Sequence, residues 1–168
     1  MKNRKNNILL SALVVAHNEE DKLNGCLSRL KQADEIIIVL DKTTDNSKKI
    51  AKYYTNKIYE GTWEYEGERR NFGLKKCKGS WILEVDADEK VPNELFKEIR
   101  KKIVNAPPGY FLVPFDNFIG NKRIRYGWGA SWGVSSAPRL SFKGCKVWNN
   151  SQRIHPSLKL KGKKGILK

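Results

Sequence analysis

The chain has 168 residues, which suffices for one domain with a sizeable hydrophobic core, and its formal net charge is +15. No apolar run reaches the ~20 residues of a membrane-spanning helix, and the apolar stretch 8–16 runs into His17-Asn18-Glu19 without the small-residue cleavage site of a signal peptide. The three cysteines lack metal-ligand spacing, so we expect reduced, mostly packed thiols in a cytoplasmic protein.

The positive charge is concentrated in the last third of the chain. Twelve Lys or Arg residues and no carboxylate follow Asp116. A field of one sign attracts anions, which include nucleic acid, an anionic membrane surface and phosphorylated glycans. A lysine-rich surface without a specific partner explains the same composition equally well.

Residues 8 to 105 alternate apolar, β-branched runs with segments of helical periodicity. We expect strands at 8–16, 35–40, 57–60 and 81–86, and helices at 19–30, 47–53, 68–77 and 92–105. Such alternation implies right-handed βαβ units and therefore the α/β class, with a mostly parallel sheet flanked by helices.

After residue 109 the sequence predicts short strands only, which form a short β-rich C-terminal part. These strands are expected at 110–118, 122–126, 138–142 and 146–148. The lysine-rich tail 159–168 is predicted as a short strand with a frayed end.

Polar residues follow three of the predicted strands at the points where the strands end. Asn18 and Glu19 follow the first strand, Asp41 ends the second, and Asp86 and Asp88 follow the strand that begins at Trp81. In an open α/β sheet ligands bind outside the carboxyl ends of the strands, and paired carboxylates suit Mg²⁺ or Mn²⁺ with a diphosphate. Solvated turns at helix starts remain the alternative. No G-x-G-x-x-G motif or P-loop is present.

Several motifs in combination are specific, and they occur in one order over residues 8 to 105. They are Val14-Val15-Ala16-His17-Asn18-Glu19-Glu20, Ala33-Asp34-Glu35-Ile36-Ile37-Ile38-Val39-Leu40-Asp41 with Thr44-Asp45, Arg69-Arg70-Asn71-Phe72-Gly73-Leu74, Gly79-Ser80-Trp81-Ile82-Leu83 and Asp86-Ala87-Asp88-Glu89. On these residues the chain resembles a family 2 glycosyltransferase with the Rossmann-like GT-A fold, in the branch of lipopolysaccharide-core β-glucosyltransferases. Pro138-Arg139-Leu140 and Arg153-Ile154-His155 extend the resemblance more weakly.

The resemblance implies a role for each matching position. It places Ala16, Asn18 and Glu19 in the nucleotide pocket, Asp41 on the base or ribose, Arg70, Asn71 and Asp86 on the donor, and Asp86 with Asp88 on Mg²⁺ or Mn²⁺ as a D-x-D motif. In one domain spanning 1–168, residues 8–105 would bind the nucleotide sugar and residues 106–168 would form a shortened acceptor side.

The implied activity is a metal-dependent, inverting transfer of a sugar, expected to be UDP-linked, to a glycan or lipid-linked acceptor in cell-envelope polysaccharide synthesis. The protein would act in the cytoplasm or on the inner face of the cytoplasmic membrane, where its basic segment meets an anionic surface. No nucleic-acid partner is expected, since no nucleic-acid-binding motif occurs.

The base that deprotonates the acceptor has no obvious counterpart in this chain. Members of this branch commonly place an acidic residue after the histidine that His155 matches, whereas Pro156 stands here. Three alternatives follow: His155 is the base, Asp116 reaches the site from strand 110–118, or the chain binds donor as a catalytically impaired or scaffold protein. The tryptophan-rich stretch 126–133 is either a sugar platform or a packed loop.

Overall fold

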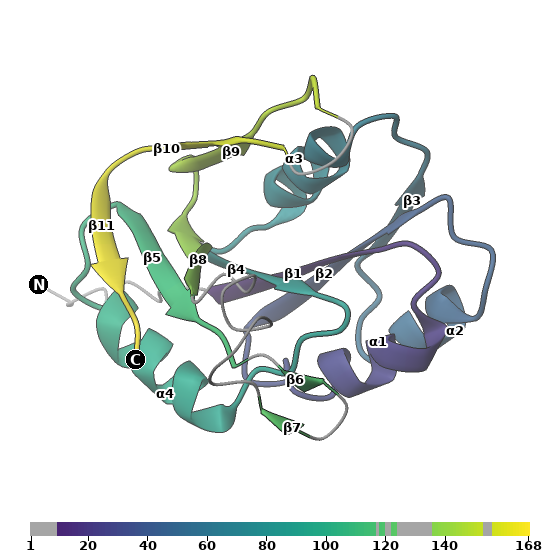
Figure 1. Ribbon diagram of the computed structural model, residues 1–168, viewed down its shortest axis with the longest axis horizontal. Helices are drawn as coiled ribbons and strands as arrows, with labels where there is room; N and C mark the ends of the chain where they lie inside the picture. Colours follow the sequence, from purple (N-terminus) through teal and green to yellow (C-terminus); the bar gives the residue numbers. More distant parts are fainter. Residues whose placement is uncertain (1–9, 117, 120–121, 124–135, 153–155) are drawn as a thin grey trace, which may run out of the picture.

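One seven-stranded sheet organises the computed structural model, which describes residues 10–116, 118–119, 122–123, 136–152 and 156–168. The strand order is β11-β5-β8-β4-β1-β2-β3 (Figure 1). The strands are β1 (Leu10–Ala16), β2 (Glu35–Asp41), β3 (Ile58–Gly61), β4 (Trp81–Asp86), β5 (Gly109–Pro114), β8 (Ser136–Phe142) and β11 (Lys163–Ile166). Two small hairpins join β6 (Phe118–Ile119) to β7 (Lys122–Arg123) and β9 (Lys146–Trp148) to β10 (Leu158–Leu160).

Helices cover both faces of the sheet, as Figure 1 shows. The helices α1 (Glu20–Leu27), α2 (Ser47–Ala51) and α4 (Asn93–Ile103) lie on one face, and α3 (Glu66–Lys76) lies on the other beside the β9–β10 hairpin. Strands buried on both faces read as near-continuous apolar runs, which explains the sequence of β1 and β2. Among the described residues no helix has both the length and the apolar character needed to cross a bilayer.

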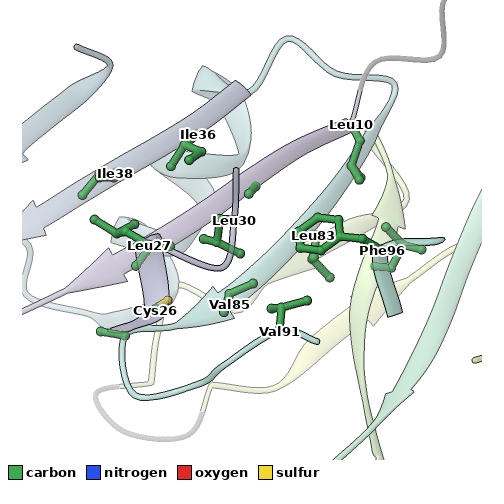
Figure 2. Packing of buried hydrophobic residues seen from close by; sticks show 14 of the residues in the cluster. Leu10, Cys26, Leu27, Leu30, Ile36, Ile38, Leu83, Val85, Val91 and Phe96 are labelled. Carbon is green, nitrogen blue, oxygen red and sulfur yellow. The ribbon is translucent and has the colours of Figure 1, made fainter. Parts of the chain in front are cut away.

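The core has two parts, because alternate residues of a strand point to opposite faces. Leu10 and Val14 of β1 pack with the side chains of α1 and α4, including Leu27 and Phe96 (Figure 2). Leu13 belongs to the smaller cluster under α3. The apolar faces that the sequence predicts for these helices are therefore confirmed.

The sheet is mostly parallel, as predicted, with one antiparallel strand inserted. β1 pairs in parallel with both β2 and β4, and β5 pairs in parallel with β11. β8 lies antiparallel between β4 and β5. Through this insertion the β-rich C-terminal part completes the same sheet that the first half begins.

The chain end is part of the sheet, so the frayed end expected within 159–168 is wrong. β11 forms a full ladder with β5, and Leu167 is 2% exposed. Gly162 precedes β11 with φ +84°, and a Cβ there would lie 2.4 Å from the carbonyl oxygen of Pro108. The short strand expected in this tail is present, but its exposed lysines gave no sign that the backbone pairs with β5 nearly to the chain end.

Two of the three cysteines are buried thiols. Cys26 and Cys77 are at most 1% exposed. Burial, assisted by nearby carboxylates, raises the pKa of each to about 12. Both are therefore protonated and unreactive at neutral pH, which agrees with the expectation of packed thiols.

Glu35, at the start of β2, joins three neighbouring segments at the edge opposite to the strands' carboxyl ends. Its Oε1 accepts hydrogen bonds from the Ser11 hydroxyl and from the backbone N–H groups of Lys78 (2.5 Å) and Gly79 (3.2 Å). Its Oε2 lies 2.7 Å from Lys57 Nζ. Burial alone would raise the pKa of Glu35, but the hydrogen bonds that it accepts, led by that from Lys57, outweigh burial and lower the pKa.

We predict that Glu35→Gln lowers the free energy of unfolding at pH 7 by about 3 kcal/mol, because buried donors lose an ionised partner. A carboxylate with a lowered folded-state pKa contributes stability above its ordinary pKa of 4.5, and this contribution disappears as the pH falls through the folded-state value. Urea denaturation should therefore show the wild type and the variant converging below about pH 4.

The matched control is Glu60→Gln, which removes a carboxylate that pairs with Lys48 at 2.5 Å on the surface. Both of these side chains are half-exposed, so the change should stay below about 1 kcal/mol. A Glu35→Gln difference that persists unchanged at low pH would contradict the linkage.

Candidate functional site

The loops that follow β1 and β2 are cross-linked into one rim at the carboxyl edge of the sheet. Asn18 has a φ of 50°, and its Oδ1 accepts the backbone N–H of Thr44 at 2.8 Å. The Glu20 carboxylate accepts the N–H of Asn46 at 2.8 Å, while Asp45 accepts the N–H of Glu20 at 3.0 Å. These reciprocal bonds hold the rim in one conformation before any ligand binds.

Asp41, at the end of β2, lies under this rim and is 5% exposed. Its carboxylate accepts the backbone N–H of Trp63 at 3.0 Å and pairs with Arg69 Nη1 at 2.8 Å. The carbonyl oxygen of Asp41 accepts a hydrogen bond from His17 Nδ1 at 2.7 Å. Asp41 therefore connects β2 to the loop after β1 and to α3.

Asp86, at the end of β4, is held by two arginines. Arg70 from α3 donates to Asp86 Oδ1 at 3.1 Å, and Arg139 from β8 donates to Oδ2. Burial favours the neutral acid, but the charges of Arg139 and Arg70 outweigh it and lower the pKa of Asp86. The carboxylate is thus ionised, with both oxygens occupied.

The turn after Asp86 presents two further carboxylates in different environments. Glu89 accepts the backbone N–H of Asp86 at 3.0 Å and a hydrogen bond from Arg139 at 2.6 Å. Burial is the main cause of its raised pKa, and it outweighs the opposing charge of Arg139. Asp88 is exposed and forms no hydrogen bond or ion pair with any residue that the structure describes.

A buried ion pair lies beneath these groups on the same face of β4. Glu84 and Lys146 are 2% and 5% exposed and form an ion pair. Glu84 also accepts a hydrogen bond from Trp148 Nε1 at 2.9 Å, and Lys146 donates to the carbonyl oxygen of Pro138 at 2.8 Å. Burial lowers the pKa of Lys146 although Glu84 opposes this.

Trp148 links this ion pair to the arginines. The guanidinium carbon of Arg70 lies 4.9 Å from the centroid of the Trp148 ring. Asn71, the next residue of α3, accepts the backbone N–H of Trp148 at 2.9 Å and donates to its carbonyl oxygen at 2.8 Å. The amide of Asn71 therefore fixes β9 against α3.

The structure brings together most of the site residues that the sequence predicts. Asn18, Glu19 and Asp41 lie at the ends of β1 and β2, where Glu19 donates its backbone N–H to Ser47 Oγ at 3.0 Å. The Ala16 side chain is part of the core and is 3% exposed, so only its backbone can face a ligand.

Of the two candidates for the catalytic base, Asp116 is among the described residues and His155 is not. Asp116 is exposed and follows the end of β5, which points to the same edge of the sheet as β4. His155 and the tryptophan-rich stretch 126–133 fall outside the described residues.

Arg139 is a site residue that the sequence analysis assigned no role. It is separated from Asp86 by 53 positions and reaches it because β8 pairs with β4. The motif Pro138-Arg139-Leu140 and the single charged residue Glu84 inside an apolar strand were the available signals, but neither says which strands become neighbours.

The profile of "Glycosyl transferase family 2" matches residues 11–154 of the chain. Curated relatives include the lipopolysaccharide core biosynthesis glycosyltransferase LpsC of Rhizobium meliloti, 25% identical over 93% of this chain and 59% of the relative. A glycosyltransferase of Rickettsia bellii is 33% identical over 54% of this chain and 31% of its own length. The chain thus spans less than 60% of the length of either relative.

Solved glycosyltransferase structures share the fold. TarS 1-349 of S. aureus superposes with a TM-score of 0.65 at 19% identity, over 85% of this chain and 51% of that one. Its complex with UDP-GlcNAc gives 0.58 at 22% identity over 70% and 37%. Glucosyl-3-phosphoglycerate synthase of Mycobacterium tuberculosis with Mg²⁺ and UDP gives 0.54 at 18% over 66% and 44%. The expected GT-A type of α/β fold is confirmed.

We predict that Lys146→Met lowers the free energy of unfolding by about 3 to 5 kcal/mol, because Glu84 is left as a buried charge without its cation. The double variant Glu84→Gln/Lys146→Met should recover a large part of this loss, since no unpaired charge remains. Urea midpoints of the two single variants and the double variant measure the coupling. Additive losses would show that the two side chains do not stabilise each other.

Proposed function

Because the chain belongs to Glycosyl transferase family 2, we propose that it transfers a sugar from a nucleotide-sugar donor to a glycan or lipid-linked acceptor in cell-envelope polysaccharide synthesis. The observation that carries this proposal is the convergence of Asn18, Asp41, Asp86 and Arg70 at the carboxyl edge of the sheet. This edge is where open α/β folds bind nucleotides.

The proposed donor is a UDP-sugar. TarS, which shares the fold, has been solved with UDP and with UDP-GlcNAc. In the present chain, Asp41 and the rim formed by the loops after β1 and β2 would form the side of the pocket that receives the base and ribose. Arg70 and Arg139 are the cations next to the proposed position of the diphosphate, since both reach Asp86.

A divalent cation fits part of this site. The described residues contain no group of three His, Cys, Asp or Glu side chains arranged to hold a metal. Asp88 offers an exposed carboxylate, and Mg²⁺ is commonly held by one or two carboxylates together with substrate phosphates. We therefore propose Asp88, with Asp86, as the protein ligands of Mg²⁺ or Mn²⁺. A bound cation would neutralise charge on the leaving diphosphate.

Inversion at the anomeric carbon requires a base near the acceptor hydroxyl. Asp116 and His155 stay the two proposed bases, and the location of Asp116 beyond β5 supports it as one of them. Transfer with inversion predicts a β-linked product from an α-linked donor. A chain that binds UDP but transfers no sugar to any acceptor would instead be a donor-binding protein.

A basic groove between α4 and the C-terminal strand β11 supports an anionic partner. A groove of about 590 Å³ between α4 and β11 is lined by five lysines: Lys101, Lys102, Lys163, Lys164 and Lys168. Glu98 is the one carboxylate in this lining. We propose that this groove contacts an anionic acceptor or the anionic inner face of the cytoplasmic membrane, where the protein would bind peripherally.

We predict that the chain binds UDP more tightly with Mn²⁺ than without it, and that Asp88→Ala removes at least about tenfold of the affinity in Mn²⁺ by deleting a cation ligand. Isothermal titration calorimetry measures both affinities. Asp34→Ala is the control, because it removes a carboxylate at the opposite edge of the sheet. No UDP binding by the wild type would refute the donor site, and equal binding by Asp88→Ala would refute Asp88 as a cation ligand.

We predict that Lys101→Glu/Lys164→Glu weakens binding to vesicles of phosphatidylglycerol by at least about tenfold at low salt, since each cation near such a surface contributes about 1 kcal/mol. Cosedimentation measures this. Lys49→Glu/Lys52→Glu is the control, because it reverses the same number of exposed charges near α2, at the far end of the sheet (Figure 1). Equal losses in both variants would indicate a general charge effect.

A further inference from the structure

The two oxygens of Asp86 are divided between arginines from different elements. Arg70 of α3 takes one oxygen and Arg139 of β8 takes the other. Both arginine side chains are 14% exposed, and that of Asp86 is 32% exposed. Each arginine also has a second carboxylate, Glu66 for Arg70 at 2.8 Å and Glu89 for Arg139 at 2.6 Å.

Stability alone does not explain this arrangement. Removing charges from water costs more than their attraction often returns, so well-packed apolar side chains usually serve a core as well or better. The Nε of Arg139 is also buried and has no hydrogen-bond partner among the residues that the structure describes. An arginine with an unsatisfied donor, next to a partly exposed carboxylate, has capacity for a further anion.

Phosphate and carboxylate are interchangeable partners for a guanidinium. A planar carboxylate and a tetrahedral phosphate each present two oxygens that accept parallel N–H groups, and arginine binds either in this way. An exchange of one anion for the other preserves the hydrogen bonds of the guanidiniums, and the carboxylate that it releases is then available to a cation. It therefore requires little movement of α3 or β8.

We propose that Arg70 and Arg139 change partners when the donor binds. In the donor-free chain both guanidiniums bind the Asp86 carboxylate, and in the donor-bound chain they bind oxygens of the diphosphate instead. This rests on the proposed function and assigns Arg139 a role as a diphosphate-binding residue. The exchange also frees the Asp86 carboxylate at the moment when the diphosphate arrives. Nucleotide and divalent cation should therefore each raise the affinity of the other, because both depend on the same rearrangement.

The first test removes the competing carboxylate. In EDTA, Asp86→Asn should bind UDP about tenfold more tightly than the wild type. The reason is that the Asp86 carboxylate no longer competes with the diphosphate for the two arginines. Asp34→Asn is the matched control, since it removes the same charge from a carboxylate that also pairs with an arginine, Arg100, but at the opposite edge of the sheet. Its effect in EDTA should stay below about threefold. Calorimetry gives both constants.

The second test removes Arg139 and compares two ligands. Arg139→Met should weaken UDP binding by about tenfold but leave the affinity for uridine, which carries no phosphate, unchanged. The same variant should bind Mn²⁺ alone more tightly than the wild type, since Asp86 loses a competitor. Arg100→Met is the control, because Arg100 is also paired with a carboxylate, Asp34 at 2.7 Å, but at the opposite edge of the sheet.

Three results would overturn the exchange. The first is equal tightening of UDP binding by Asp86→Asn and Asp34→Asn in EDTA. The second is a loss of uridine binding that matches the loss of UDP binding in Arg139→Met, which would show a structural role. The third is a wild-type chain that binds no UDP, which would remove the proposed function as well. The first two leave the proposed function intact, so the failures are distinguishable.

Discussion

The parallel pairing of β1 with β2 on one side and β4 on the other is the constraint on which the site depends. Because all three strands run the same way, their carboxyl ends meet at one edge. The ladder aligns Val15 with Val39 of β2 and with Asp86 of β4. Asn18, Asp41 and Asp86 are distant in sequence, and this alignment alone makes them neighbours.

The face of the sheet under α3 accepts charge because each charge there has a partner. Glu84 is neutralised by Lys146, and Asp86 by two arginines, so the face combines a small apolar cluster with a polar network. The opposite face is apolar and supplies most of the packing. One face of the sheet thus supplies most of the apolar packing, and the other carries the charged side chains. Ion pairs on the charged face can change partners without disturbing the main apolar core.

The sequence predicted the features that depend on neighbouring residues, namely the strands, the helices and the order in which they alternate. The apolar runs that end at Asp41 and Asp86 predicted β2 and β4, and they also predicted that both carboxylates lie at the carboxyl edge of the sheet. The position of β8 between β4 and β5 depends on pairing between distant segments, so Arg139 was named in a motif but given no role. Asn71 shows the same limit: its identity matched a donor-binding motif, while in the structure its amide binds the backbone of β9. The lysine-rich tail was predicted to contain a short strand, but its pairing with β5, which is made by backbone groups, could not be read from its side chains.

The inserted position of β8 has a consequence for how the chain folds. The units β1–α1–β2 and β4–α4–β5 can form from neighbouring segments, whereas β8 must enter between two strands that precede it, with Leu140 pairing to Leu83. Contacts between distant segments form slowly, so β8 is expected to dock late. Until it docks, Asp86 and Glu89 lack the arginine that pairs with both of them, and Asp86 has Arg70 as its remaining partner. The charged network around Asp86 is therefore completed by the segment that joins the sheet last.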